Sequence, residues 1–181
     1  FTLLKKTLDQ MPEVTKQLKG FYTPIPKILF RYYRLCDWEG KSAGDQCIEI
    51  EDEIINQEYV DFFGIEILEG EMVNEKDEEG SVVINEAAVK ALGWTQSVGK
   101  IIPIGSQAHT VKGVIKDIYY NAPIHPVTPA MFSFQKKDTN EGHIIFKVKE
   151  GTWKKVTQKL IEEAKKVNPD AQPFISNMEN V

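Results

Sequence analysis

The stretch Val82–Trp94, VVINEAAVKALGW, joins two kinds of local structure and guides the interpretation of the surrounding chain. Its first three residues are β-branched, which favours a buried strand, whereas the residues after Glu86 are mostly Ala, Lys and Leu, which favour a helix. Asn85 therefore falls at the N-cap, where its side-chain oxygen can accept a backbone N–H that the first turn leaves unpaired. Gly93 is expected to end the helix, because glycine adopts a positive φ without strain.

Glu86 allows two interpretations. Its carboxylate lies in the first turn of the expected helix, where the helix dipole favours it without any further role. Functional carboxylates also occur at strand-to-helix junctions, and Asp117, at the end of a second expected strand, is the best other candidate for catalysis. The structural alternative for Asp117 is a turn residue that ends its strand. We interpret both carboxylates as structural.

Length and composition exclude several classes of protein. With 181 residues the chain can bury a sizeable core, so one domain or two small connected domains are expected. The 22 basic and 27 acidic residues give a net charge of −5 without a lysine-arginine cluster, which argues against a nucleic-acid partner. No apolar run is long enough to cross a membrane, and the opening FTLL resembles the interior of a longer protein. We therefore expect an excised domain.

The two cysteines, Cys36 and Cys47, flank a turn-rich stretch. If residues 28–36 and 47–53 pair as a hairpin, the cysteines lie nearly opposite each other, at a separation compatible with a disulfide. Such a bridge would contribute roughly 2 to 3 kcal/mol and would require an oxidising compartment. The alternative, two unrelated reduced thiols, stays open.

Turn and cap signals divide the rest of the chain. Apolar residues recur at helical spacing between residues 4 and 18, which predicts an amphipathic helix, or two short ones separated at Pro12. A short helix is expected between Asn56 and Gly64, and the strand after it is closed by Gly70. Residues 100–104 and 109–120 read as a hairpin.

The second strand of that hairpin contains Gly113, which suggests a bulge or a close backbone approach. Three prolines make residues 121–132 an extended connector, neither a helix nor a central strand. A strand at 143–150 and a helix that ends before Asn168 and Pro169 follow, and residues 171–181 are expected to form a short strand. Because helices and strands alternate without a regular βαβ repeat, the predicted fold class is α+β.

No pattern of catalytic or metal-binding residues stands out. His109, His125 and His143 lack the spacing of metal ligands, and the sequence has no CxxC, phosphate-binding loop, G-x-S-x-G or HExxH motif. We therefore expect no catalytic, cofactor-binding or metal-binding residue. This favours a binding or mechanical domain over an enzyme.

Four blocks of sequence carry a family resemblance: EYVDFFGIEILEGEMV, SVVINEAAVKALGWTQSVGKII, HTVKGVIKDIYYNAPIHPVTPAMF and HIIFKVKEGTWKKVTQKLIEEAKKVNPDAQPF. Their order and spacing resemble the periplasmic core domain of MacB-type ABC transporter permeases, a group related to FtsX, in the form common in Bacteroidetes. The resemblance covers residues 55–181 well and the first 54 residues in outline. The family usually has a proline where this chain has Ser97, which puts only a turn geometry in doubt. The matching positions are Phe62, Phe63, Gly64, Gly70, Asn85, Glu86, Leu92, Gly93, Gly99, Lys100, Gly113, Val114, Asp117, Asn168 and Pro169.

The resemblance implies a two-subdomain architecture. A porter-like α/β subdomain would be built from residues 1–56 and 141–181. A small mixed α/β subdomain would be inserted as residues 57–140. No cofactor is implied for this domain.

The resemblance also implies a function and a location. The domain would be the extracytoplasmic loop between the first two membrane helices of a permease, on the periplasmic side of the inner membrane. Members form homodimers or heterodimers, and their ATPase lies in the cytoplasm on the same chain or on another subunit. ATP-driven movement would be passed to the periplasm for export or efflux, with a periplasmic adaptor and an outer-membrane duct as further partners. The domain itself would be non-catalytic.

Two other functions remain as alternatives. The first is a secreted or lipid-anchored module that binds a ligand in an apolar pocket lined by Tyr119, Tyr120 and Trp153. The second is a hydrolase that uses Glu86 and Asp117, which would need these two carboxylates within roughly 10 Å of each other in a cleft.

Overall fold

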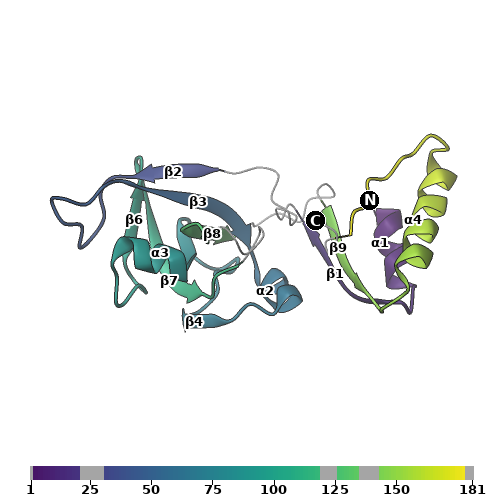
Figure 1. Cartoon of the computed structure of the whole chain (residues 1–181), viewed down its shortest axis with the longest axis horizontal. Coiled ribbons are helices and arrows are strands. Elements are labelled where there is room, and N and C mark those ends of the chain that lie inside the picture. The colour runs from purple at the N-terminus through teal and green to yellow at the C-terminus, as the bar shows by residue number, and fades with distance from the viewer. Residues whose placement is uncertain (1, 21–30, 119–125, 135–142, 178–181) are drawn as a thin grey trace. The chain divides into compact units, whose positions relative to one another are not determined.

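The computed structural model describes residues 2–20, 31–118, 126–134 and 143–177 (Figure 1). Contacts divide the chain into two compact units. Unit 1 combines Phe1–Pro24 with Asp138–Val181, and unit 2 is the continuous segment Ile25–Lys137. The sequence predicted a boundary after residue 56, whereas the strands between residues 32 and 55 pair within unit 2. The inserted unit is therefore the larger of the two.

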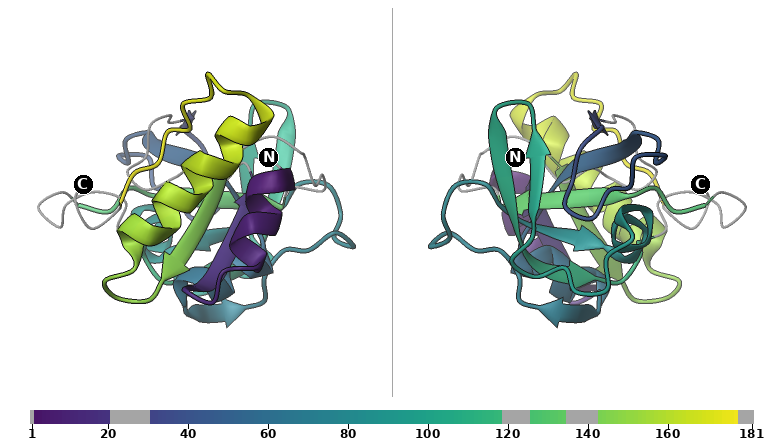
Figure 2. Two further views of the ribbon diagram at one scale, coloured as in Figure 1. Left: turned by 90° about the vertical axis from the view of Figure 1, so that its right-hand side faces the viewer. Right: turned by 90° about the vertical axis from the view of Figure 1, so that its left-hand side faces the viewer.

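Unit 1 is a two-stranded antiparallel ribbon with two helices on one face (Figure 2). The ribbon pairs Leu18 with Ile145, and its helix-facing side chains pack on the buried residues Leu8, Val156 and Leu160. Apolar spacing along both helices explains this packing. The elements of unit 1 are α1 (Thr2–Asp9), β1 (Val14–Gly20), β9 (His143–Val148) and α4 (Trp153–Val167).

Two predictions for unit 1 were wrong. The helical spacing extended to residue 18, but residues 14–20 form β1, because their backbone pairs with β9 more than a hundred residues later in the chain. Such a distant partner leaves no local signal, and tertiary pairing overrides a weak helical pattern. Residues 171–177, expected as a strand, have no regular secondary structure. Residues 178–181 lie outside the described part of the chain.

Unit 2 is built on a seven-stranded mixed sheet whose strands run in the order β2-β3-β8-β5-β7-β4, with β6 paired to β7. The pairs β3–β8 and β5–β7 are parallel, and the others are antiparallel. This mixture of strands and helices confirms the α+β class. The elements are β2 (Tyr32–Leu35), β3 (Ile48–Ile55), α2 (Gln57–Phe63), β4 (Ile67–Gly70), β5 (Ser81–Asn85), α3 (Glu86–Leu92), β6 (Ile101–Ile104), β7 (Gln107–Ile115) and β8 (Ala130–Phe134).

The strand β8 corrects the prediction that residues 121–132 contain no central strand. Residues 119–125 lie outside the described ranges, but Ala130–Phe134 inserts between β3 and β5 near the middle of the sheet. The last proline, Pro129, precedes the strand and therefore takes no N–H away from it. Its apolar residues fill a central position that only the complete sheet creates.

The main described core of unit 2 lies between α3 and one face of this sheet. It is a cluster of twelve buried residues, so it is far larger than the described core of unit 1. Among the described residues, no helix is long and apolar enough to cross a membrane. The members of the cluster are Leu35, Trp38, Ile50, Val82, Ile84, Ala88, Leu92, Trp94, Ile102, Val111, Val114 and Met131.

Candidate functional site

The junction between β5 and α3 brings together the polar residues that the sequence singled out. Asn85 is 2% exposed, has an extended backbone, and accepts the Ala88 N–H at 3.0 Å, as expected of an N-cap. The same oxygen also accepts the Ala130 N–H at 2.9 Å, and the Asn85 amide donates to the Thr128 carbonyl at 2.9 Å. Asn85 therefore joins the start of α3 to the start of β8.

Glu86 and Asp117 face each other across this junction. The Glu86 Oε2 atom accepts the Asp117 N–H at 3.1 Å, and the Asp117 Oδ1 atom accepts the Ala87 N–H at 3.0 Å. Burial raises the pKa of Asp117, the Ala87 N–H opposes the rise, and the Glu86 charge adds to it. These two hydrogen bonds connect the start of α3 to the segment just after β7.

The hydrolase alternative required the two carboxylates to lie close together in a cleft, and the structure meets the first of these conditions. The carboxylates are close, yet each uses an oxygen to hold a backbone N–H, which suits a structural role better than proton transfer. Neither residue lines the cavity of about 710 Å³ that lies in unit 2 between Val73, Ser81, Gln107 and Phe134. The arrangement favours the capping interpretation made from the sequence.

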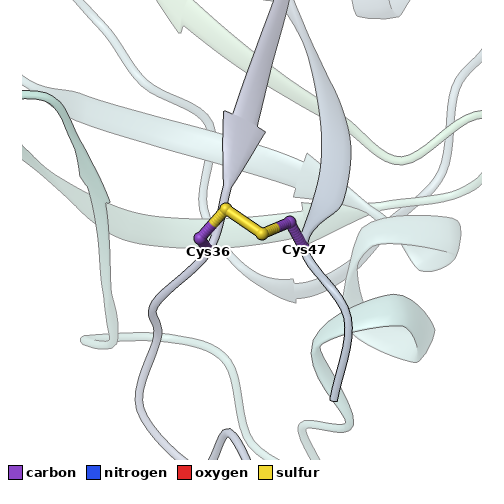
Figure 3. Close-up of a disulfide and its surroundings, with 2 residues drawn as sticks. All are labelled: Cys36 and Cys47. Atoms are coloured by element: carbon purple, nitrogen blue, oxygen red, sulfur yellow. A yellow bond between two sulfur atoms is a disulfide. The ribbon is translucent and has the colours of Figure 1, made fainter.

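Cys36 and Cys47 form a disulfide at the ends of β2 and β3, with their Cα atoms 4.2 Å apart (Figure 3). The strands are antiparallel, and Leu35 pairs with Ile48 just inside the bridge. The hairpin on which the disulfide prediction depended is therefore present. Cys36 is exposed, so the bridge lies at the surface of unit 2.

Two tryptophans hold the disulfide loop against α3. The buried Trp38 donates its indole N–H to the Leu92 carbonyl at 3.1 Å, and Trp94 donates to the Glu39 carbonyl at 2.7 Å. Because Leu92 is the last residue of α3, its carbonyl has no partner within the helix and gains one from the loop. Each of these two hydrogen bonds joins residues more than fifty positions apart, so the sequence alone did not predict them.

Two strands approach each other so closely that only glycine fits at positions 70 and 113. A Cβ on Gly113 would lie 2.5 Å from the Glu71 carbonyl oxygen, and one on Gly70 would overlap the Lys112 carbonyl. The pairing of β5 with β7 also shifts by one residue at Gly113. Both features that this glycine predicted, a bulge and a close backbone approach, are therefore present.

The remaining motif residues mark ends and turns. Gly64 and Gly93 follow α2 and α3 with φ values of 69° and 68°, as helix C-terminal glycines do. Gly99 lies in the turn before β6, where its N–H donates to Val111. Pro169 follows Asn168 directly beyond α4.

The apolar pocket of the ligand-binding alternative finds no support in the described residues. Tyr119 and Tyr120 lie outside them, and Trp153 belongs to unit 1, where it stacks on Phe146.

Solved structures with the same fold come from transporter proteins. The periplasmic region of MacB from Actinobacillus actinomycetemcomitans is 21% identical, with 98% of this chain and 78% of that chain covered and a TM-score of 0.57. A domain of a protein described as a permease from Porphyromonas gingivalis is 14% identical, with 92% and 76% covered and a TM-score of 0.59. The extracellular domain of the ABC-type transporter YknZ from Gram-positive bacteria is 15% identical, with 93% and 82% covered and a TM-score of 0.54. The fold is thus one found in extracytoplasmic domains of transporter permeases.

Residues 37–164 match the family described as the MacB-like periplasmic core domain, and the chain belongs to this family. A comparison with curated proteins gives no significant match. The resemblance noted from the sequence is confirmed, together with its α+β fold.

Proposed function

We propose that this domain transmits ATP-driven movement of a permease to the periplasm, for export or efflux of a substrate. The ATPase would be a cytoplasmic domain or subunit, and the permease would work as a homodimer or heterodimer anchored by flanking membrane helices. A periplasmic adaptor and an outer-membrane duct would be further partners. The domain would lie on the periplasmic side of the inner membrane and would not itself be catalytic.

The observation that carries this proposal is the family match over residues 37–164, supported by the order of the two units along the chain. The first and last described residues, Thr2 and Asn177, both belong to unit 1, and unit 2 is inserted between its halves. Movement applied through the two halves of unit 1 would reach unit 2 through two chain connections. A rigid-body movement of this kind needs no catalytic residue. In this proposal unit 1 takes the porter-like role.

The rigidity of unit 2 suits the transmission of movement. The two indole hydrogen bonds and the Asn85 network each join segments that are distant in sequence, and the disulfide bridges the hairpin of β2 and β3. A disulfide also suits an oxidising compartment outside the cytoplasm.

The test is a distance measurement in the full-length permease, reconstituted with its ATPase in lipid vesicles. A spin label is placed at Ala43, on the exposed disulfide loop, through an unnatural amino acid that leaves the cysteines bridged. We expect the distance between the labels of two copies to differ between the nucleotide-free and ATP-bound states. Identical distances in both states would contradict the proposal.

A matched control keeps this result interpretable. The same label at Gln158, an exposed position on α4, reports movement of unit 1 under the same conditions.

Membrane fractionation of the full-length gene product distinguishes the permease domain from the alternative, a secreted or lipid-anchored ligand-binding module. A product released without detergent, or held only by a lipid anchor, would favour the ligand-binding module.

A further inference from the structure

Both chain connections between the units join unit 2 beside the same strand, β3. The first connection precedes β2, whose first residue, Tyr32, pairs with Glu51 of β3. The second follows β8, whose last residue, Phe134, pairs with Ile55 of β3. Because β2 is antiparallel to β3 and β8 is parallel to it, both points lie along the second half of β3. Movement of either connection therefore acts on a strand that is paired with β3.

The strand β8 is held by the interior of the sheet. It forms five consecutive residue pairs with β3. The Ser133 hydroxyl also donates to the Glu53 carbonyl at 3.2 Å. On its other side β8 pairs with β5. It therefore cannot leave the sheet without breaking two sets of backbone hydrogen bonds.

The strand β2 depends on contacts at its two ends. It forms four residue pairs with β3 and, among the described strands, pairs with no other. Beside the connection, the Arg31 guanidinium lies 3.0 Å from the Asp52 carboxylate, and the Asp52 N–H donates to the Arg31 carbonyl at 2.8 Å. At the far end, the disulfide of Cys36 and Cys47 joins β2 to β3 covalently (Figure 3). Four residue pairs are thus enclosed between an ion pair and a covalent bond.

The Arg31–Asp52 pair differs from an ordinary surface ion pair. The Asp52 side chain is only 12% exposed, whereas that of Arg31 is 68% exposed. Burial raises the pKa of Asp52, and the charges of Arg31 and then His109 oppose the rise. A carboxylate so far removed from water depends on its partner, and this favours one position of Arg31. The pair therefore fixes the point at which the chain enters the sheet.

We propose that β3 is the strand through which movement of unit 1 enters unit 2, and that the Arg31–Asp52 pair and the disulfide hold β2 to it at both ends. This inference rests on the proposed function, because it requires unit 1 to move and unit 2 to follow. From β3 the chain continues into α2, and β8 links β3 to β5, which continues into α3. A displacement of β3 therefore reaches both helices through continuous backbone and paired strands. The disulfide keeps β2 attached if its four residue pairs break.

The test follows the two units separately in the full-length permease, reconstituted with its ATPase in lipid vesicles. A spin label is placed through an unnatural amino acid at Lys90, an exposed position on α3, or at Gln158 on α4. The distance between the Lys90 labels of two copies should differ between the nucleotide-free and ATP-bound states. An unchanged distance in the unaltered permease would contradict the proposed function, and this inference with it.

Variants of the two contacts test the inference itself. Asp52→Asn or Arg31→Gln removes the ion pair, and Cys36→Ser with Cys47→Ser removes the disulfide. With ATP bound, we expect the ratio of ATP-state to nucleotide-free distances at Lys90 to fall at least about twofold in each variant, while the ratio at Gln158 stays unchanged. Combining Asp52→Asn with Arg31→Gln should add nothing to either change, because both act on one contact.

The variant Lys116→Gln is the matched control. It removes an ion pair of similar length, 3.1 Å to Glu66, which lies beside β7 and β4 and not beside β3. Both ratios should stay as in the unaltered permease. Amide NMR spectra of the 181-residue chain verify that each variant folds. Unchanged Lys90 ratios in the ion-pair and disulfide variants, or an equal fall with Lys116→Gln, would overturn the inference while leaving the proposed function intact.

Discussion

The two units of this chain are stabilised in different ways. Unit 1 has a two-stranded ribbon, two helices and three buried core residues within its main described cluster. Unit 2 has a seven-stranded sheet, a cluster of twelve buried residues and a disulfide. A two-stranded ribbon is marginally stable without further packing, whereas a large mixed sheet buries enough surface to be stable alone. The difference suggests that unit 2 remains folded under conditions that open unit 1.

Polar contacts follow the same division. In unit 2 the N-cap residue of α3, Asn85, also bonds to the distant residues Thr128 and Ala130. In unit 1 the N-cap residue of α4, Thr152, makes no side-chain cap hydrogen bond, and its hydroxyl donates to Lys149 three residues earlier. The cap residue of α3 thus joins distant segments, whereas the hydroxyl of the α4 cap residue bonds only locally, and α4 reaches a distant segment through the Lys155–Glu13 ion pair.

The test with the largest expected effect replaces one tryptophan in each unit by alanine. Trp38→Ala removes a buried core side chain and the indole bond to Leu92, so we expect unit 2 to lose about 4 kcal/mol. Trp153→Ala removes a half-buried ring stacked on Phe146 and should cost unit 1 about 2 kcal/mol. Native-state hydrogen exchange measures both, through peptides from β3 and β9. Equal loss of protection in both peptides for either variant would show that the units unfold together.

The second test compares the N-caps. Asn85→Ala leaves the Ala88 and Ala130 N–H groups without their acceptor, so we expect a loss of about 3 kcal/mol. Thr152→Ala should cost less than about 0.5 kcal/mol, because no helix N–H depends on that side chain. Urea unfolding followed by tryptophan fluorescence gives both values. A similar loss for the two variants would remove the contrast in polar contacts.

The third test opens the disulfide. Replacing Cys36→Ser and Cys47→Ser together should lower the stability of unit 2 by roughly 2 to 3 kcal/mol, because the unfolded chain regains the freedom of the loop. We expect the native fluorescence of Trp38 and Trp94 to persist, since their hydrogen bonds do not involve the bridge. Exchange of unit 1 peptides should be unchanged. A shift of the native emission would mean that the tryptophans depend on the disulfide.

The smallest expected effect concerns pH. Burial raises the pKa of Asp117 in unit 2, so the folded state holds its proton more tightly than the unfolded chain. The contribution of Asp117 to the free energy of unfolding therefore falls as the pH rises from the ordinary carboxyl pKa through the raised pKa of Asp117. Asp117→Asn should remove this decline, an effect below about 1 kcal/mol because the group is partly exposed.

Glu163 in unit 1 should show the opposite slope. Hydrogen bonds from Lys159 and then Lys166 lower its pKa, so its contribution is present above the ordinary carboxyl pKa and is lost as pH falls. Urea midpoints of Asp117→Asn and Glu163→Gln, measured between about pH 3 and 7, compare the two. Slopes of the same sign would contradict the assigned causes.

Local signals predicted the parts of the fold that depend on neighbours in sequence. Asn56, Gly64, Asn85 and Gly93 mark the ends of α2 and α3 as expected, because caps act within one helical turn. The hairpin bridged by Cys36 and Cys47 was likewise readable from its turn.

Features that depend on distant partners could not be predicted. The strand β1 is defined by β9, and β8 is defined by strands on both of its sides. The contacts of Asn85 with Thr128 and Ala130 required the position of β8, which the prolines before it obscured.

The central position of β8 has a consequence for how the chain acquires its structure. Both of its neighbours, β3 and β5, are complete by residue 85, but β8 spans residues 130–134. As the chain emerges with its N-terminus first, each of these two strands must keep one edge unpaired until residues 130–134 have appeared. Unpaired edges of apolar strands are where chains associate wrongly. We therefore expect the interval before β8 arrives to be the stage of biogenesis at which this protein most needs a chaperone.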